Sequence, residues 1–179
     1  MVKTAARSVH YQGALDSLCG AYAITNALAL CEVKPCKRVF SSCLGALSGR
    51  RWPQLLWDGT SFGDLQRMLR PLQGLLARRS IRVRYPFART VPNSNEQYWQ
   101  CFDELFAQRG SRVAIVGIRR PHWHWIVAQP VRGGIKFFDS HPAAPAFVKR
   151  RSSLYAGERK RGAPWIIDRS EMILFQCRK

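Results

Sequence analysis

Cys19 has the surroundings best suited to chemistry of any cysteine in the sequence. It lies between the polar residues Asp16 and Ser17 and an apolar run over residues 21–31 that predicts a helix. A thiol in the first turn of a helix lies at the positive end of the helix dipole, which favours the thiolate. A thiolate is the nucleophile of covalent catalysis. The segment alone also fits the alternative in which Cys19 is a small buried apolar residue.

His124 and Asp139 are the candidate partners of this thiol. A cysteine nucleophile needs an imidazole to take its proton and a third group to orient the imidazole. His124 begins a strand-like run over residues 124–128, and Asp139 lies near the end of a second run over residues 135–140. The residues between the two runs predict a turn. In an antiparallel hairpin the start of the first strand lies beside the end of the second, so we expect His124 to pair in register with Asp139.

Alternatives to this pair remain open in the sequence. His122 and His141 lie close to the candidate pair, and His124 is preferred as the base because it begins the strand. Asn93 and Asn95 are the alternative orienting residues, since an amide can replace the carboxylate. They precede the histidine in the chain, so Asp139 is preferred.

The order of these residues resembles the papain-like cysteine peptidases, in particular the branch that trims bacteriocin leader peptides after a Gly-Gly pair. The matching positions are Gln12, Cys19-Gly20, His124-Trp125-Ile126-Val127 and Asp139. The resemblance implies that Cys19 is the nucleophile, His124 the base and Asp139 the orienting residue. It further implies that Gln12 donates to the oxyanion beside the backbone N–H of Cys19. This chemistry needs no cofactor and no metal.

The chain departs from the pattern of that branch at three places. Leu18 replaces an Asp directly before the cysteine, and Asp16 lies two positions earlier. The interval between Gln12 and the cysteine is one residue longer than in the pattern. Asp139 is followed by residues 140–141 before the next Pro, where the branch has Pro at once.

The expected fold is α+β, with one domain over residues 1–179. The resemblance implies a two-lobe papain-like fold in which an N-terminal helical half carries the nucleophile and a C-terminal antiparallel sheet carries the base. Apolar periodicity predicts the following helices: residues 21–31, 37–47, 62–72 and 96–108. It predicts the following strands: residues 81–85, 113–118, 123–131, 135–139 and 172–176. We expect Trp123 and Trp125 to pack in the core.

The net charge of +18, from 29 Lys and Arg against 11 Asp and Glu, indicates a polyanionic or acidic partner. The basic residues are dispersed, with an exposed basic loop expected over residues 149–161. The alternative for that loop is a solvated segment without a ligand. No zinc finger, helix-turn-helix or aromatic RNA-binding motif accompanies the charge, so it favours electrostatic docking over sequence recognition.

The six cysteines form no CxxC pair and no Cys/His zinc pattern, and we expect the five besides Cys19 to be reduced core thiols. Reduced thiols indicate a cytoplasmic, reducing site of action. No apolar stretch reaches the 18 to 20 residues or so of a membrane helix, and the N-terminal segment does not fit a signal peptide. If the protein leaves its cell, we expect a dedicated secretion machine to deliver it.

Two classes of function follow. The first is a cysteine peptidase with the triad Cys19, His124 and Asp139, which as a free-standing basic protein is similar to papain-like toxins that bacteria deliver into competitors. Its expected partners are a protein or peptide substrate, among which we favour a DNA-associated protein, and an acidic immunity protein. A transamidase or deamidase would use the same triad. The second class is a non-catalytic basic protein bound to nucleic acid or the ribosome, in which Cys19 is structural.

Overall fold

The computed structural model describes residues 9–13, 16–141, 146–158 and 160–177. Its α-helices are α1 (Cys19–Leu30), α2 (Cys36–Gly45), α3 (Gln54–Asp58), α4 (Phe62–Leu69), α5 (Gln73–Arg78) and α6 (Asn95–Ala107). Its 3₁₀ helices are η1 (Gly49–Arg51), η2 (Arg70–Leu72) and η3 (Arg151–Ser153). Its strands are β1 (Ile81–Arg84), β2 (Ser111–Arg120), β3 (His124–Val131), β4 (Gly134–Phe138), β5 (Ala146–Lys149), β6 (Leu154–Ala156) and β7 (Trp165–Cys177). The protein is therefore an α+β protein whose helices mostly precede the sheet.

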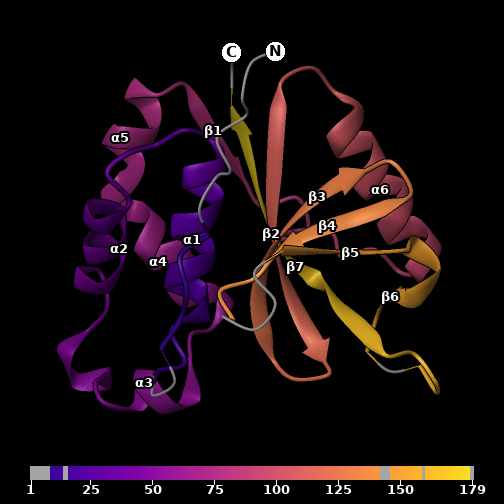
Figure 1. The fold of residues 1–179 in the computed structure, drawn as a ribbon, viewed down its shortest axis with the longest axis horizontal. Coiled ribbons are helices and arrows are strands. Elements are labelled where there is room, and N and C mark those ends of the chain that lie inside the picture. Colours follow the sequence, from indigo (N-terminus) through magenta and orange to yellow (C-terminus); the bar gives the residue numbers. More distant parts are fainter. Residues whose placement is uncertain (1–8, 14–15, 142–145, 159, 178–179) are drawn as a thin grey trace.

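The strands form one sheet in the order β1-β7-β2-β3-β4-β5, with β6 pairing β7 in parallel and the other pairs antiparallel. Helices α1 to α5 gather on one side of the sheet, and α6 lies on the other side (Figure 1). The long strand β7 is inserted between β1 and β2, although these two precede it in the chain. The result is a helical half and a sheet half that meet along α1.

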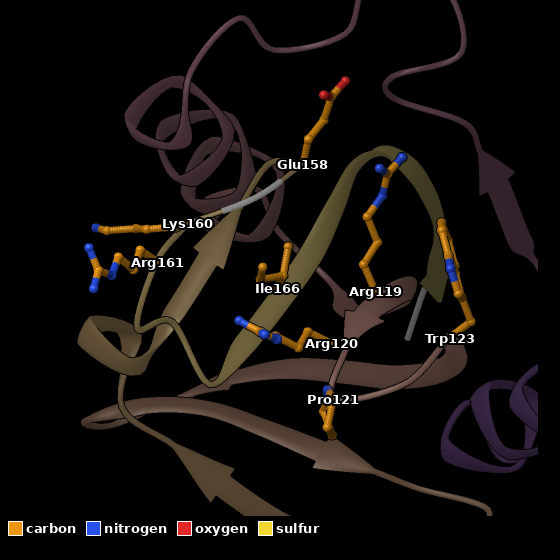
Figure 2. A pocket seen from close by; sticks show the side chains of 8 residues that line it. All are labelled: Arg119, Arg120, Pro121, Trp123, Glu158, Lys160, Arg161 and Ile166. Atoms are coloured by element: carbon orange, nitrogen blue, oxygen red, sulfur yellow. The ribbon is translucent and has the colours of Figure 1, made fainter.

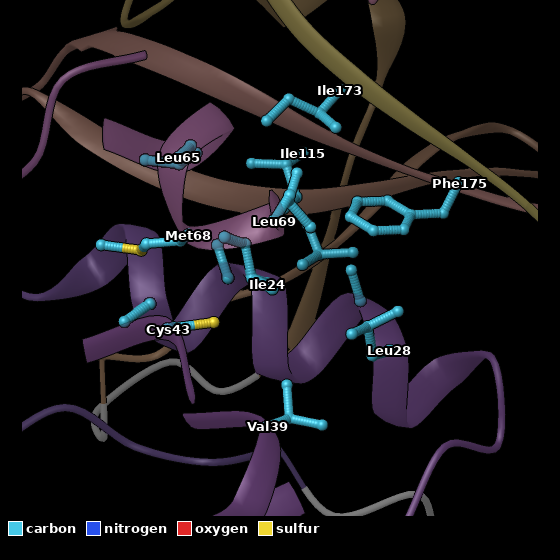
Figure 3. Packing of buried hydrophobic residues seen from close by; sticks show 14 of the residues in the cluster. Ile24, Leu28, Val39, Cys43, Leu65, Met68, Leu69, Ile115, Ile173 and Phe175 are labelled. Carbon is cyan, nitrogen blue, oxygen red and sulfur yellow. The ribbon is translucent and has the colours of Figure 1, made fainter. Parts of the chain in front are cut away.

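Side chains along each strand point alternately to the two faces of the sheet, so the buried apolar residues form two cores, one on each face. On β2, Val113 and Ile115 pack against the helices α1, α2 and α4, whereas Val116 and Ile118 point to the opposite face, which α6 covers. Figure 3 shows the first core, where Ile24 of α1 packs beneath the sheet. Helix α1 is buried almost along its whole length, and its alanines let it approach β2 and β3 closely. The helix that begins at Cys19 is thus a central part of the core.

The predicted helices and strands over residues 19–140 are all present, with shifts of a few residues at their ends. The helix predicted over residues 62–72 divides into α4 and η2, because Pro71 has no N–H for an α-helical hydrogen bond. The short elements α3, α5, β5 and β6 were not predicted. The segment expected as a basic loop contains η3 and the half-buried strand β6, with its buried Leu154, and is not one continuous loop. Arg159 lies outside the described residues.

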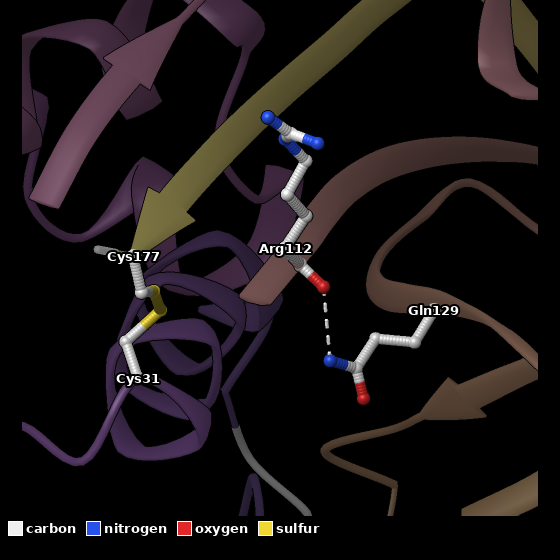
Figure 4. Close-up of a disulfide and its surroundings, with 4 residues drawn as sticks. All are labelled: Cys31, Arg112, Gln129 and Cys177. Carbon is white, nitrogen blue, oxygen red and sulfur yellow. Dashed lines mark hydrogen bonds between the residues drawn. A yellow bond between two sulfur atoms is a disulfide. The ribbon is translucent and has the colours of Figure 1, made fainter. Parts of the chain in front are cut away.

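The prediction that the five other cysteines are reduced is wrong for two of them. Cys31 and Cys177 form a disulfide between the end of α1 and the end of β7 (Figure 4). Their Cα atoms are 6.1 Å apart, a usual separation for such a bond. The pairing depends on two chain positions 146 residues apart, which no local pattern reveals. Cys19, Cys36, Cys43 and Cys101 are free thiols.

None of the helices in the described part of the chain combines the length and the apolar character needed to cross a membrane.

Candidate active site

The loop before α1 is organised by Asp16 and delivers Cys19 as the first residue of the helix. The Asp16 carboxylate accepts hydrogen bonds from the backbone N–H groups of Gly13, at 2.8 Å, and Leu18, at 3.1 Å. The backbone N–H of Ser17 donates to the Leu56 carbonyl at 2.8 Å, which ties the loop to α3. The N–H groups of the first helical turn have no partner within the helix. Cys19 therefore stands beside backbone donors, as an oxyanion site requires.

Two glycines allow the chain to close around the thiol. A Cβ on Gly20 would collide with Thr60 Oγ1 and lie 2.5 Å from Leu65 Cδ1, so a side chain there would push α4 away from α1. Gly59 has a φ of +79°, which favours glycine, and a Cβ there would lie 3.2 Å from the Ser17 carbonyl oxygen. Both glycines maintain the close approach of the Thr60 segment to the nucleophile.

His124 joins the thiol to Asp139. Its Nε2 lies 2.6 Å from Asp139 Oδ1, and the Cys19 side chain is near enough to raise the pKa of the imidazole. Because Nε2 faces the carboxylate, Nδ1 is the ring nitrogen left for the thiol. The same Asp139 oxygen accepts the backbone N–H of His141 at 2.8 Å, which fixes the carboxylate in place. The three residues predicted as a triad thus come together, with His124 hydrogen-bonded to Asp139 and beside Cys19 in the same cleft.

The register of the hairpin differs from the predicted one. Val127 pairs with Phe138 and Ala128 with Phe137, so the ladder extended by one step puts Asp139 opposite Ile126, not opposite His124. Side chains two residues apart on a strand point to the same face, so Asp139 still reaches the imidazole diagonally. His124 itself pairs with Ile118 of β2. The side chains of His124 and Asp139 meet because they point to the same face of the sheet, although the two residues are not paired directly.

The electrostatics of the chain favour a charged imidazole. Burial lowers the pKa of His124, but the hydrogen bonds to Asp139 and Cys19, with the negative charge of both partners, outweigh this and raise the pKa to about 9. Burial raises the pKa of Asp139, but the hydrogen bond and the charge of His124 outweigh that effect and lower it. The side chains of His124 and Asp139 are each only 10% exposed, so water screens this interaction little. The arrangement suits an imidazolium at His124 beside an ionised Asp139.

Gln12 lies beside the triad. Its backbone N–H donates to the Ser140 carbonyl at 2.8 Å, next to Asp139 in the chain, and its side-chain amide donates to the Asp16 carbonyl. It is not among the described residues that line the cleft. Two of the alternatives lie apart from the triad: the His122 ring is 5.6 Å from that of His124, and Asn95 bonds to Trp99 and to the backbone of Ala156. His141 meets Asp139 through its backbone N–H.

A cleft of about 540 Å³ opens at the thiol between the two halves of the molecule. Its walls include three tryptophans, two carboxylates and an arginine: Trp57, Trp123, Trp125, Asp58, Glu171 and Arg51. Trp125 is buried as predicted, and its Nε1 donates to the Thr60 carbonyl at 2.6 Å. The prediction that Trp123 packs in the core is wrong, because it lies in the turn before β3 and is 64% exposed.

Glu171 and Thr60 are polar cleft residues that the sequence did not single out. Glu171 Oε2 is buried and has no hydrogen-bond partner among the described residues, and burial together with the charge of Asp168 raises the pKa of Glu171 to about 7. A Cβ on Gly117 would lie 2.7 Å from this oxygen, so the glycine makes room for the carboxyl group. The Thr60 hydroxyl is likewise buried and unpaired among the described residues. Only their tertiary position reveals them.

In the part of the chain that the structure describes, no three His, Cys, Asp or Glu side chains come together in a way that could hold a metal ion. A comparison with protein-family models finds no match to the sequence, and a comparison with curated proteins finds none either. The interpretation of the site therefore depends on its geometry and on the motifs themselves.

Proposed function

We propose that the protein is a cysteine peptidase of papain-like fold, with Cys19, His124 and Asp139 as its triad. The observation that carries this proposal is the meeting, in one cleft, of Cys19 at the start of α1 with His124, whose imidazole is hydrogen-bonded to the buried Asp139. A structural cysteine would need neither an imidazole at its sulfur nor a carboxylate behind that imidazole. The two-lobe arrangement, with the nucleophile on a helix and the base on a sheet, supports the same assignment.

In the proposed reaction the Cys19 thiolate attacks the carbonyl carbon of a peptide bond and forms a tetrahedral oxyanion. His124, as imidazolium, gives its proton to the leaving amine, and a thioester remains on Cys19. Neutral His124 then takes a proton from water, whose oxygen attacks the thioester; the acid product leaves and the imidazolium–thiolate pair returns. Asp139 holds the imidazole in position throughout.

The oxyanion is stabilised by the backbone N–H of Cys19 and by a side-chain donor. Gln12 is the donor that the resemblance implies; one of its amide hydrogens is bonded to Asp16, and the other is left for the oxyanion. Removal of such a donor costs about 100- to 1,000-fold in kcat. Gln12→Ala should therefore reduce hydrolysis by about 100-fold. An unchanged rate in Gln12→Ala, with a loss in Thr60→Val, would give the role to the Thr60 hydroxyl.

The cleft walls favour a substrate with small residues beside the scissile bond, because three tryptophans crowd the space around the thiol. Cleavage after Gly-Gly fits this cleft. A transamidase or deamidase would form the same thioester and differ only in the acceptor. Product masses after a reaction in water with added amine separate the two: hydrolysis adds the mass of water, and transamidation adds the amine.

The reactivity of Cys19 is the first test. Cys19 is only 8% exposed, whereas Cys36 and Cys101 are more accessible, so labelling governed by exposure alone would favour these two. We expect iodoacetamide to modify Cys19 at least about tenfold faster near neutral pH, because the imidazolium stabilises the thiolate. Mass spectrometry of peptides after timed labelling measures the rates. Slower labelling of Cys19 than of Cys36 and Cys101 would contradict the proposal.

The biological setting proposed for this activity is that of an interbacterial toxin acting in the cytoplasm of a target cell, with an acidic immunity protein as its inhibitor. The charge of +18 supports an acidic partner, and opposite fields speed such capture. Wild type and Cys19→Ala are expressed at equal abundance in bacteria, and new protein N-termini are mapped. Toxicity and new N-termini should require Cys19. Equal toxicity of both forms would favour the non-catalytic basic binding protein.

A further inference from the structure

A second hollow of about 580 Å³ lies beside the cleft, and it is positively charged. We call it the basic pocket; its lining residues are Arg119, Arg120, Pro121, Trp123, Glu158, Lys160, Arg161 and Ile166. Figure 2 shows Arg120 pointing from the end of β2 toward the segment that carries Lys160 and Arg161, with Ile166 between them. Four cations face one carboxylate here. The pocket therefore suits an anionic ligand.

Two of these cations have no ion-pair partner among the residues that the structure describes, Arg120 and Arg161. Lys160 lies over the Tyr155 ring at 5.1 Å, and its charge helps to lower the pKa of Glu96. Elsewhere in the molecule exposed arginines do pair, as Arg151 does with Asp103 at 2.5 Å. The unpaired charges gather around one hollow, so they are available to a ligand there.

The wall between the two hollows is held by a buried carboxylate. Asp168, 3% exposed, accepts a hydrogen bond from Arg119 Nε at 2.6 Å and forms an ion pair with Arg119 Nη2 at 2.5 Å. The other Asp168 oxygen accepts the backbone N–H and the hydroxyl of Ser170, at 2.8 and 2.6 Å. The Arg119 guanidinium in turn lies 5.0 Å from the centre of the Trp123 ring. This row of contacts fixes an exposed indole that would otherwise be free to move.

Trp123 lines both the cleft and the basic pocket, so the two hollows adjoin at its ring. His124 pairs with Ile118, and Arg120 lies two residues further along β2, which is about 7 Å at the rise of an extended strand. A peptide with its scissile bond at Cys19 would need only a few extended residues to reach the cations. The geometry points to one bound chain that occupies both hollows.

We propose that the basic pocket binds an acidic segment of the same peptide that Cys19 cleaves, a few residues from the scissile bond. This inference depends on the proposed peptidase function. A peptide fits better than a nucleic acid, because a phosphodiester backbone continuing into the cleft would meet the carboxylates of Asp58 and Glu171. An acidic peptide can have a neutral Gly-Gly at the cleft and carboxylates only where the cations lie.

Affinity labelling tests the thiol and the pocket together. Two iodoacetyl peptides carry a spacer of two to four glycines and then a tail of four Asp or four Asn. The Cys19 thiolate displaces iodide from either reagent. If the pocket binds the tail, the Asp reagent should label Cys19 about tenfold faster than the Asn reagent at low salt, which corresponds to about 1.4 kcal/mol of tail binding. Added salt should reduce this ratio, since it screens exposed charges.

Matched variants locate the effect. Arg120→Glu/Arg161→Glu should abolish the advantage of the Asp reagent, whereas Arg89→Glu/Arg132→Glu, which makes the same charge change at exposed residues away from the pocket, should retain it. Arg120→Gln/Arg161→Gln repeats the test without new negative charge. Thermal melting and the iodoacetamide rate of each variant report the fold and the thiol.

Each outcome is decisive for a different statement. Slow iodoacetamide labelling of wild-type Cys19 contradicts the peptidase function itself. Fast iodoacetamide labelling with equal rates for the Asp and Asn reagents overturns the inference and leaves the peptidase intact. If both double Arg→Glu variants lose the advantage of the Asp reagent equally, that advantage comes from the overall positive charge of the protein and not from the pocket, which also overturns the inference. If oligothymidylate of the same charge blocks the Asp reagent more strongly than a free Asp peptide does, the pocket binds nucleic acid and the acidic-peptide proposal is wrong.

Discussion

The cleft at Cys19 and the basic pocket share the wall formed by Trp123 and have similar volumes, about 540 and 580 Å³. Their charges differ. In the cleft, Arg51 is paired with Asp64, and His124 is paired with Asp139. In the pocket, Arg120 and Arg161 form no ion pair with any described residue. The cations of the cleft are thus paired within the protein, whereas the pocket has cations left for a ligand.

The largest expected effect is that of a change at His124, which lines the cleft and not the basic pocket. His124→Gln should slow iodoacetamide labelling of Cys19 by about 100-fold or more, because general acid–base partners contribute about 100- to 10,000-fold. His122→Gln is the matched control, since its ring lies 5.6 Å from that of His124 and apart from the triad. Labelling kinetics by mass spectrometry measure both. Equal slowing by the two variants would remove the distinction between cleft and surroundings.

The second effect concerns the pH range of the cleft. A raised histidine pKa means that the imidazolium stabilises the fold fully below about pH 6.5, and that this contribution is lost as the pH rises through about 9. The imidazolium of His124 should therefore disappear near pH 9 in the wild type. In Asp139→Asn the transition should move to lower pH, with about tenfold slower labelling at neutral pH. NMR of the imidazole during a pH titration checks the shift. A transition near 9 in both forms would exclude Asp139 as its cause.

The third effect compares the acids of the two hollows. Since the pKa of Glu171 is raised to about 7, its ionisation destabilises the fold: the penalty is absent below about pH 4.5 and complete above pH 7. Glu171→Gln should therefore be more stable than the wild type at pH 8, by roughly 1 to 2 kcal/mol after allowance for its partial exposure, and equal to it near pH 4. Urea unfolding at both pH values measures this. Glu158→Gln, at an exposed position in the basic pocket, should change neither value.

The smallest effect tests the shared wall. Trp123→Ser removes the ring that lies over Arg119, an interaction worth about 0.5 to 1 kcal/mol at an exposed site. The advantage of the Asp reagent over the Asn reagent should fall about threefold, whereas the iodoacetamide rate should not change. A change in the iodoacetamide rate alone would assign Trp123 to the cleft and not to the pocket.

The chemical centre could be predicted from the sequence because its determinants are local. The first residue of α1 follows from turn residues before an apolar run, and strand periodicity puts His124 and Asp139 on one face even though their exact pairing was misjudged. An error of two residues in register preserves the face of a strand, whereas an error of one would have separated the side chains. This explains why a partly wrong hairpin still identified the correct pair.

The residues around the centre could not be predicted, because their positions depend on contacts between segments that are far apart in the chain. Cys31 meets Cys177, and Glu171 enters the cleft, only because β7 is inserted between β1 and β2. The exposure of Trp123 depends on where β3 begins, and a shift of one residue there decides between core and surface. The gathering of Arg120, Lys160 and Arg161 requires the turn before β7 to approach the end of β2. Positions such as these are set by contacts between distant segments.

The place of β7 in the sheet has a consequence for the protein during its synthesis. A ribosome makes the chain from the N-terminal side, so the nucleophile and the base both emerge before the strand that separates β1 from β2. Until β7 arrives, neither of those strands has its neighbour on that side, and the Glu171 wall of the cleft and the Cys177 thiol are missing. A nascent chain with Cys19, His124 and Asp139 already translated is therefore still an incomplete sheet. Its cleft is complete only once β7 has been made and has entered the sheet.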